Sequence, residues 1–202
     1  LAEHRQVATA FEAQAQQGMF QRGRRMLQVA TYSFDPSIAD MLGPLLVGGV
    51  VCIPREDEVL TELAAVIRRF QVDVIDITPS VANLLDPAEI PTLKELRLGG
   101  EAVTAAQLAR WTSSSSSRRS SSPLEFHNSY GPSECCVTAA LTPPLHASAD
   151  PLNFGVPVGC RMVIVHPDDP RRLVALGLVG ELAIQGPIVT RGYLNNPGAQ
   201  AK

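Results

Sequence analysis

The chain has 202 residues, of which 45% are apolar, 18% charged and 5% aromatic, a composition typical of an ordinary globular protein. This composition excludes disorder throughout, and the length predicts one domain and a fraction, with room for a sizeable core. The formal net charge of −3 excludes a strong field that would recruit nucleic acid or an anionic membrane, so we expect neither partner.

The longest apolar run, residues 41–53, contains Pro44 and three glycines and falls short of the roughly 20 residues that a membrane helix needs. We therefore expect a buried core segment there. The four cysteines form no C-x-x-C pair, which favours buried thiols in a reducing cytosol and hence a cytoplasmic protein. Because Leu1 is not preceded by a leader and the segment ending at Lys202 has no stop signal of its own, we interpret the chain as a piece of a longer protein.

Short β-rich runs alternate with helical periodicity from residue 25 to residue 100, and this alternation predicts an α/β fold with a mostly parallel sheet and flanking helices. The strands are expected at residues 26–30, 47–53, 72–77 and 93–98. The second of them is a nearly continuous apolar run, of the kind that is buried on both faces of a sheet.

Helices are expected between these strands. Apolar residues at helical spacing from Leu60 to Phe70 predict one helix, with acids at residues 56–58 near its first turn and Arg68 and Arg69 in its last, where the helix dipole favours those charges. A short helix is expected at residues 81–85, and Thr104 is a predicted N-cap for a helix that runs to Trp111.

The second half of the chain differs from the first in composition and in its pattern of apolar residues. Residues 113–122 are serine-rich and of low complexity, which predicts a solvated loop before a strand at residues 124–127. Beyond residue 150, short β-like runs at 161–165, 173–176 and 181–184 predict an antiparallel sheet. We therefore divide the chain into an α/β subdomain, residues 1–143, and part of a β-rich subdomain, residues 144–202.

Three strand ends carry residues suited to binding a ligand, namely residues 34–37, 98–101 and 128–134. In open α/β sheets the ligand crevice lies outside the carboxyl ends of the strands. Tyr130 offers a flat face for a base, and Glu134 offers a hard oxygen ligand for Mg²⁺. Each residue also has a purely structural alternative: Asp35 could cap a helix, Tyr130 could be a core ring and Glu134 a surface charge.

Other kinds of site find little support. The serine-rich stretch has no Gly or Lys with which to cradle phosphates, and no G-x-G-x-x-G follows a strand. The four histidines are scattered, and no Cys is placed to pair with one of them, so we expect neither a metal-histidine site nor a protease site.

Together these segments resemble the adenylate-forming enzymes, and specifically an amino-acid adenylation domain of a nonribosomal peptide synthetase. Residues 34–37 (F-D-P-S) are similar to the family's F-D-x-S motif. Residues 128–134 (N-S-Y-G-P-S-E) are similar to N-x-Y-G-P-T-E, with Ser in place of Thr. Residues 180–194 (G-E-L-A-I-Q-G-P-I-V-T-R-G-Y-L) are similar to G-E-L-x-I-x-G-x-x-V-A-R-G-Y-L, and the three motifs come in the family's order.

The resemblance implies roles for individual residues. Asp35 is expected to bind the α-ammonium of the amino acid, and Glu134 to hold Mg²⁺. Residues 180–194 are expected to shape and support the site. The nucleotide site is assigned to Gly100, Glu101, Asn128, Tyr130, Gly131 and Ser133.

The resemblance also assigns the pocket for the substrate's side chain to Pro36, Ala39, Asp76, Arg97, Gly99, Ser129, Val137 and Thr138. Asp76 and Arg97 carry opposite charges, and an unpaired buried charge is costly. We therefore expect them to pair with each other or with polar atoms of the substrate, which predicts a large amino acid with a polar or hydrogen-bonding side chain.

The implied reaction joins ATP and an amino acid into aminoacyl-AMP and pyrophosphate. The aminoacyl group then passes to the phosphopantetheine of a carrier protein, so carrier-protein and condensation domains are the expected partners. The family's phosphate loop and catalytic Lys have no counterpart in these 202 residues. We therefore expect no catalytic residue within the chain and no activity from the chain alone.

Two alternatives stay open. An acyl- or aryl-CoA ligase belongs to the same superfamily, but its acid substrate would give Asp35 no ammonium partner. A non-catalytic remnant or interaction module is favoured by the missing loops and by the serine-rich insertion.

Overall fold

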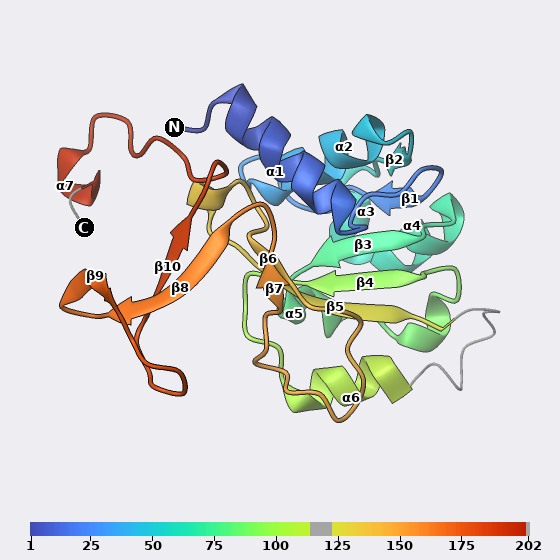
Figure 1. Ribbon diagram of the computed structural model, residues 1–202. Helices are drawn as coiled ribbons and strands as arrows, with labels where there is room; N and C mark the ends of the chain where they lie inside the picture. Colours follow the sequence, from blue (N-terminus) through green and yellow to red (C-terminus); the bar gives the residue numbers. More distant parts are fainter. Residues whose placement is uncertain (114–122, 201–202) are drawn as a thin grey trace.

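The computed structural model describes residues 1–113 and 123–200, and Figure 1 shows their arrangement. The serine-rich loop expected at residues 113–122 lies, apart from Ser113, outside the described residues. Within the part of the chain that is described, no helix is long and apolar enough to cross a bilayer.

A seven-stranded sheet of order β2-β1-β3-β4-β5-β6-β7 forms the centre of the molecule (Figure 1). Its first five strands are parallel and the last two antiparallel, so the predicted mostly parallel α/β architecture is confirmed. The strands are β1 (Arg25–Leu27), β2 (Val50–Cys52), β3 (Val74–Ile77), β4 (Glu95–Leu98), β5 (Glu125–Tyr130), β6 (Ala140–Leu141) and β7 (Val156–Pro157).

Helices cover this sheet and close two apolar clusters. One cluster joins α4 and α6 to the central strands and includes the fully buried Leu96 and Trp111. The other joins α1 and α2 to the 135–141 region and includes Phe11 and Phe20, whose rings meet edge to face. The helices are α1 (His4–Gln16), α2 (Pro36–Leu46), α3 (Glu56–Thr61), α4 (Leu63–Phe70), α5 (Pro79–Ala82), α6 (Ala105–Ser113) and α7 (Pro197–Gln200), with 3-10 turns η1 (Pro87–Glu89) and η3 (Ser133–Cys135).

The apolar run at residues 41–53 differs from the prediction. Its first part is the C-terminal half of α2, where Leu45 and Leu46 are exposed, and the strand begins only at Val50. Strand β2 lies at the sheet edge with one neighbour, and Val50 and Ile53 are exposed. The prediction of a segment buried on both faces was therefore wrong. Apolar composition alone does not indicate whether a strand lies in the middle of a sheet or at its edge.

The helix expected to span Leu60 to Phe70 is broken. Glu62 leaves helical geometry with φ −136° and ψ 30°, which separates α3 from α4. The charges at the two ends are as predicted: three acids occupy the first turn of α3, and Arg68 and Arg69 lie in the last turn of α4. Thr104 is confirmed as a cap, since its Oγ1 accepts a hydrogen bond from the backbone N of Gln107 at 3.2 Å.

A second, antiparallel sheet of order β10-β8-β9 follows, as predicted. Its strands are β8 (Arg161–His166), β9 (Asp169–Leu173) and β10 (Glu181–Gln185). The strand expected at residues 173–176 was placed too late, because the short turn after His166 starts β9 at Asp169 and leaves Leu176 fully exposed. Since β7 still belongs to the first sheet, the change of sheet falls between residues 157 and 161, and the division at residues 143/144 stays a prediction.

Candidate functional site

The carboxyl edge of the parallel strands opens on a cavity of about 860 Å³. Parallel strands bring their carboxyl ends to one edge of a sheet, which is where such folds bind ligands. The cavity is lined by many of the residues singled out from the sequence: Asp35, Pro36, Asp76, Gly99, Gly100, Ser129, Tyr130, Gly131, Ser133, Val137 and Thr138. The three sequence segments therefore meet in one place.

Five other candidates do not line this cavity: Ala39, Arg97, Glu101, Asn128 and Glu134. Ala39 is buried in the apolar cluster of α1 and α2. The other four side chains form ion pairs or hydrogen bonds with protein groups, and these contacts, described below, explain their positions.

Asp35 stands immediately before α2, whose first residue is Pro36. Its side chain makes no capping hydrogen bond to that helix, and its backbone is helical, with φ −59° and ψ −29°. The capping alternative is therefore not what the structure shows, and the half-buried carboxylate is left facing the cavity.

Arg97 is paired differently from the expectation. Its guanidinium is fully buried, with Nε 3.1 Å from Glu95 Oε1 and Nη2 donating to the Met19 carbonyl at 2.9 Å. It also lies over the Phe20 ring, 5.9 Å from the centroid. Asp76 is the register partner of Arg97 on the neighbouring strand, but the ion pair forms with Glu95. Residues two apart on a strand share a face, so the spacing of Glu95 and Arg97 was the signal that sequence reasoning missed.

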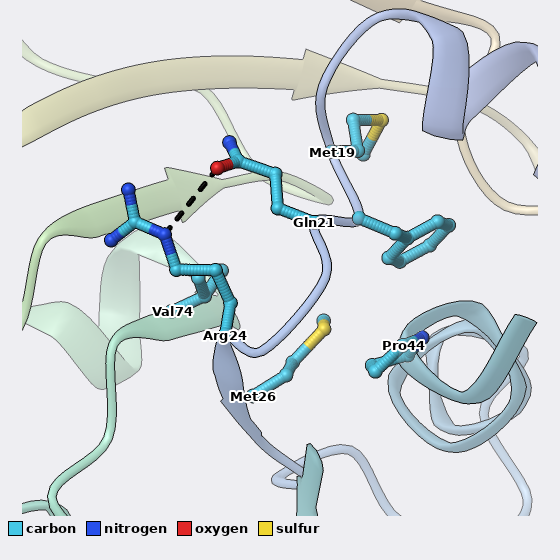
Figure 2. A pocket seen from close by; sticks show the side chains of 7 residues that line it. Met19, Gln21, Arg24, Met26, Pro44 and Val74 are labelled. Atoms are coloured by element: carbon cyan, nitrogen blue, oxygen red, sulfur yellow. Dashed lines mark hydrogen bonds between the residues drawn. The ribbon is translucent and has the colours of Figure 1, made fainter. Parts of the chain in front are cut away.

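A second, much smaller cavity has a volume of about 10 Å³. Figure 2 shows the side chains that line it, among them Met19, Met26 and Pro44. Gln21 Oε1 accepts a hydrogen bond from Arg24 Nε at 3.3 Å beside it. This space is about that of one water molecule, so we assign it to packing of the chain that carries Met19 and not to a ligand.

Two neighbouring carboxyl groups have perturbed acidities. Burial raises the pKa of Asp76 to about 6, with Arg97 acting in the opposite direction. Burial, and secondly the charge of Asp76, raises the pKa of Asp40 to about 8. Asp40 is 1% exposed, and its Oδ2 accepts a hydrogen bond from the backbone N of Val29 at 3.4 Å. Asp40 is therefore neutral at pH 7, and nothing in the local sequence indicated this.

The 128–134 segment places an aromatic ring at the cavity. Tyr130 is 38% exposed and packs on Phe154 with ring centroids 5.0 Å apart, so the core-ring alternative is wrong. Asn128 is buried and uses its Nδ2 to donate to the carbonyls of Asn153, at 2.9 Å, and Pro151, at 3.3 Å. Its donor group therefore holds the 151–155 turn beside the aromatic pair.

A tight turn follows Tyr130. A Cβ on Gly131 would lie 2.0 Å from the Val137 carbonyl oxygen, so only glycine fits. Val137 itself has φ 80°, a strained conformation for a β-branched residue, of the kind found at binding sites. Gln14, fully buried on α1, donates to the carbonyls of Cys136 and Thr138 at 3.2 Å each and holds this turn in place. Sequence reasoning missed Gln14 because its partners lie more than 120 residues away.

Glu101 and Gly99 shape the other side of the cavity. Glu101 Oε2 accepts hydrogen bonds from the backbone N of Ser80, at 3.0 Å, and from its hydroxyl, at 2.6 Å. A Cβ on Gly99 would lie 2.5 Å from Ser129 Oγ, which itself donates to the Leu98 carbonyl at 3.2 Å. Only glycine therefore allows the chain after β4 to pack this closely against Ser129.

Glu134, in η3, is bonded to the segment that follows β10. Its Oε1 accepts a hydrogen bond from the Tyr193 hydroxyl, which is the main reason that its pKa is lowered. Its carbonyl accepts from the backbone N of Thr190 at 2.8 Å. A single ionised carboxylate suits Mg²⁺, which proteins often bind through one or two carboxylates together with substrate phosphates. Within residues 1–113 and 123–200, no cluster of three or more His, Cys, Asp or Glu could hold a metal by itself.

Comparisons with known proteins match this arrangement. The family model described as AMP-binding enzyme matches residues 1–194. Nonribosomal peptide synthetase 4 of Gibberella zeae is 40% identical over 200 residues, which is 99% of this chain and 2% of that protein. The chain thus spans a small part of the length of the relatives that it matches.

Solved structures share the fold. A nonribosomal peptide synthetase bound to AMPPNP matches with a TM-score of 0.81 and 24% identity, over 100% of this chain and 22% of that one. A long-chain-fatty-acid-CoA ligase from Archaeoglobus fulgidus matches with a TM-score of 0.80 and 20% identity, over 98% of this chain and 41% of that one. The fold alone therefore does not separate amino acids from fatty acids as substrates.

Proposed function

The chain belongs to the AMP-binding enzyme family of adenylate-forming ligases, and from this premise we propose that it activates an amino acid in nonribosomal peptide synthesis. The observation that carries the proposal is Asp35, a carboxylate that faces the cavity and makes no capping bond. An α-ammonium group would satisfy it, whereas a fatty or aryl acid would leave it without a partner.

In the proposed reaction an oxygen of the amino acid's carboxylate forms a bond to the α-phosphorus of ATP. The bond from that phosphorus to the bridging oxygen breaks, and pyrophosphate leaves with the electron pair. Catalysis of such a step consists mostly of positioning and charge neutralisation. Asp35 would fix the amino group, and so the direction from which the carboxylate approaches.

The nucleotide would lie against the turn that follows β5. Tyr130 offers its exposed ring to the adenine, and Ser133 offers a hydroxyl to the α-phosphate. Gly100, Gly131, Glu101 and Asn128 would shape this side, the last two through the loops that they hold in place. Glu134 would hold Mg²⁺, which when bound neutralises charge on the phosphates.

Loading of the aminoacyl group onto the phosphopantetheine of a carrier protein would follow, with condensation domains as neighbours in the same assembly line. We place this work in the cytoplasm. The alignment to a much longer relative named as a nonribosomal peptide synthetase supports these partners. The 202-residue chain alone is expected to give no turnover.

The test is ATP–pyrophosphate exchange by the longer protein that carries this chain. We expect exchange with α-amino acids, and a loss of about 100-fold or more in kcat/KM for Asp35→Ala, because truncating one partner of a buried charge pair costs several kcal/mol. Asp57→Ala, at an exposed acid on α3, is the matched control and should leave exchange unchanged.

Other outcomes separate the alternatives. Exchange that depends on fatty or aryl acids and persists in Asp35→Ala would instead support the CoA-ligase alternative. Absence of both exchange and ATP binding would support a non-catalytic remnant.

A further inference from the structure

The charged groups at the centre of the sheet are unequally compensated. Arg97 forms an ion pair with Glu95 and donates to the Met19 carbonyl, and neither Arg97 nor Glu95 lines the cavity. Asp76, on the adjacent strand, does line the cavity. Within residues 1–113 and 123–200, Asp76 has no ion pair within 4.0 Å and no hydrogen bond from another side chain. Among the described residues, one carboxyl group therefore faces the cavity with no ion pair and no side-chain hydrogen bond, and only the more distant charges of Arg97 and His127 favour its ionised form.

The rest of the cavity lining supplies no free cation to Asp76. Arg68 lines the cavity, but its Nη1 donates to the Glu89 carbonyl at 3.0 Å and lies 3.8 Å from the Glu89 carboxylate. Besides Asp76, the remaining charged lining residues are acidic, namely Asp35, Glu62 and Glu89. The neighbours expected from the sequence in the side-chain pocket, Gly99, Ser129, Val137 and Thr138, are uncharged.

Resting on the proposed function, we propose that the activated amino acid carries a cationic side chain, and that Asp76 is the residue that selects it. With the α-ammonium on Asp35, the only substrate charge left to meet Asp76 is on the side chain. An acidic side chain would bring two carboxylates together, and an apolar one would bury Asp76 without a partner. A side-chain ammonium or guanidinium compensates the carboxylate.

The shape of the cavity admits such a side chain. Gly99 lines the cavity without a side chain of its own, and its close packing against Ser129 leaves no room for a Cβ. The volume of about 860 Å³ lies within the range of small-molecule sites and leaves room for a long side chain beside a nucleotide. Lysine, ornithine and arginine are the members of this class to test first.

The first test is substrate choice by the unmodified longer protein in pyrophosphate exchange. Lysine is compared with norleucine, which has nearly the same shape without the charge, and with Nε-acetyl-lysine and glutamate. We expect kcat/KM for the best cationic substrate to exceed that for norleucine by on the order of 100-fold. Equal use of norleucine or Nε-acetyl-lysine, or a preference for glutamate, would overturn the inference while leaving adenylation intact. No exchange with any amino acid would overturn the proposed function itself.

The second test assigns the selection to one residue. Asp76→Asn should reduce the ratio of kcat/KM for the cationic substrate over norleucine to about 10-fold or less. Glu62→Gln removes another acidic group from the cavity lining and should keep the ratio within about 3-fold of wild type. If Glu62→Gln abolished the preference and Asp76→Asn did not, the assignment to Asp76 would be wrong.

Discussion

The two sheets contain the same local pattern in very different surroundings. In β4, Glu95 and Arg97 lie two residues apart with Oε1 and Nε at 3.1 Å, and in β9 Asp169 and Arg171 lie two apart with Oδ1 and Nε at 3.2 Å. The Arg97 side chain is fully buried, whereas that of Arg171 is 92% exposed. The same kind of ion pair is thus desolvated in one sheet and solvated in the other. This difference determines how much each pair contributes to the free energy of unfolding.

The contrast extends to the rest of the two sheets. All four residues of β4 are buried, while four of the five residues of β9 are exposed. The second sheet is tied to the first through the segment after β10, where Ile188 is fully buried and Thr190 bonds Glu134. Perturbed carboxyl groups and the cavity occur at the first sheet, where burial makes electrostatic differences large.

The largest expected effect comes from breaking the buried pair. Arg97→Ala leaves Glu95 buried without its partner and removes a fully buried side chain, so we expect the free energy of unfolding to fall by about 4 kcal/mol. Urea denaturation of the chain measures this. A loss below about 1 kcal/mol would show that the two arginine pairs are energetically alike.

The next largest effect is expected from truncating a buried leucine in the first sheet, compared with an exposed leucine in the second. Leu96 is fully buried in β4, and Leu173 is 61% exposed at the end of β9. Leu96→Ala should cost about 3 kcal/mol, the usual range for a buried leucine, and Leu173→Ala no more than about 0.5 kcal/mol. Both values come from the same denaturation experiment. Equal costs would mean that the second sheet is covered in solution.

The sequence predicted the parallel sheet, the C-terminal end of β4 at Leu98 and the cap at Thr104, because these depend on local periodicity and capping chemistry. It did not predict α1, nor α2 within the apolar run that ends at β2. Whether an apolar side chain is buried depends on which element packs over it, and that is fixed by the whole topology.

The functional site, like the fold, could be predicted from the sequence only in part. The convergence of the strand ends follows from the general rule for parallel sheets. The bond from Arg97 to the Met19 carbonyl, and the bonds of Gln14 to the 136–138 turn, depend on where residues 14–20 lie in the folded chain. The neutral state of Asp40 depends on its depth, which no local pattern indicates.

The protonation state of Asp40 can be tested through the pH dependence of the free energy of unfolding. Its pKa is about 8 in the folded chain against an ordinary value of 3.8, so its contribution to stability is complete below about pH 4 and is lost as the pH rises towards 8. Between about pH 5.5 and pH 7 the loss is roughly 2 kcal/mol, from 1.36 kcal/mol per pH unit.

Asp40→Asn mimics the neutral form and should remove this slope, as followed by urea denaturation at several pH values. Asp168→Asn, at a side chain that is 92% exposed before β9, should leave the slope as in wild type. Parallel slopes for wild type and Asp40→Asn would show that Asp40 is ionised when folded.

The smallest expected effect belongs to the exposed member of the opening comparison. Arg171→Ala removes an ion pair between side chains that are 92% and 42% exposed, so water already solvates both charges. We expect the free energy of unfolding to change by less than about 0.5 kcal/mol, and the change to disappear at about 1 M salt, where the screening length falls to about 3 Å. A loss comparable with that of Arg97→Ala, unaltered by salt, would mean that Arg171 packs against a surface that excludes water, and that the two sheets differ less than their exposures indicate.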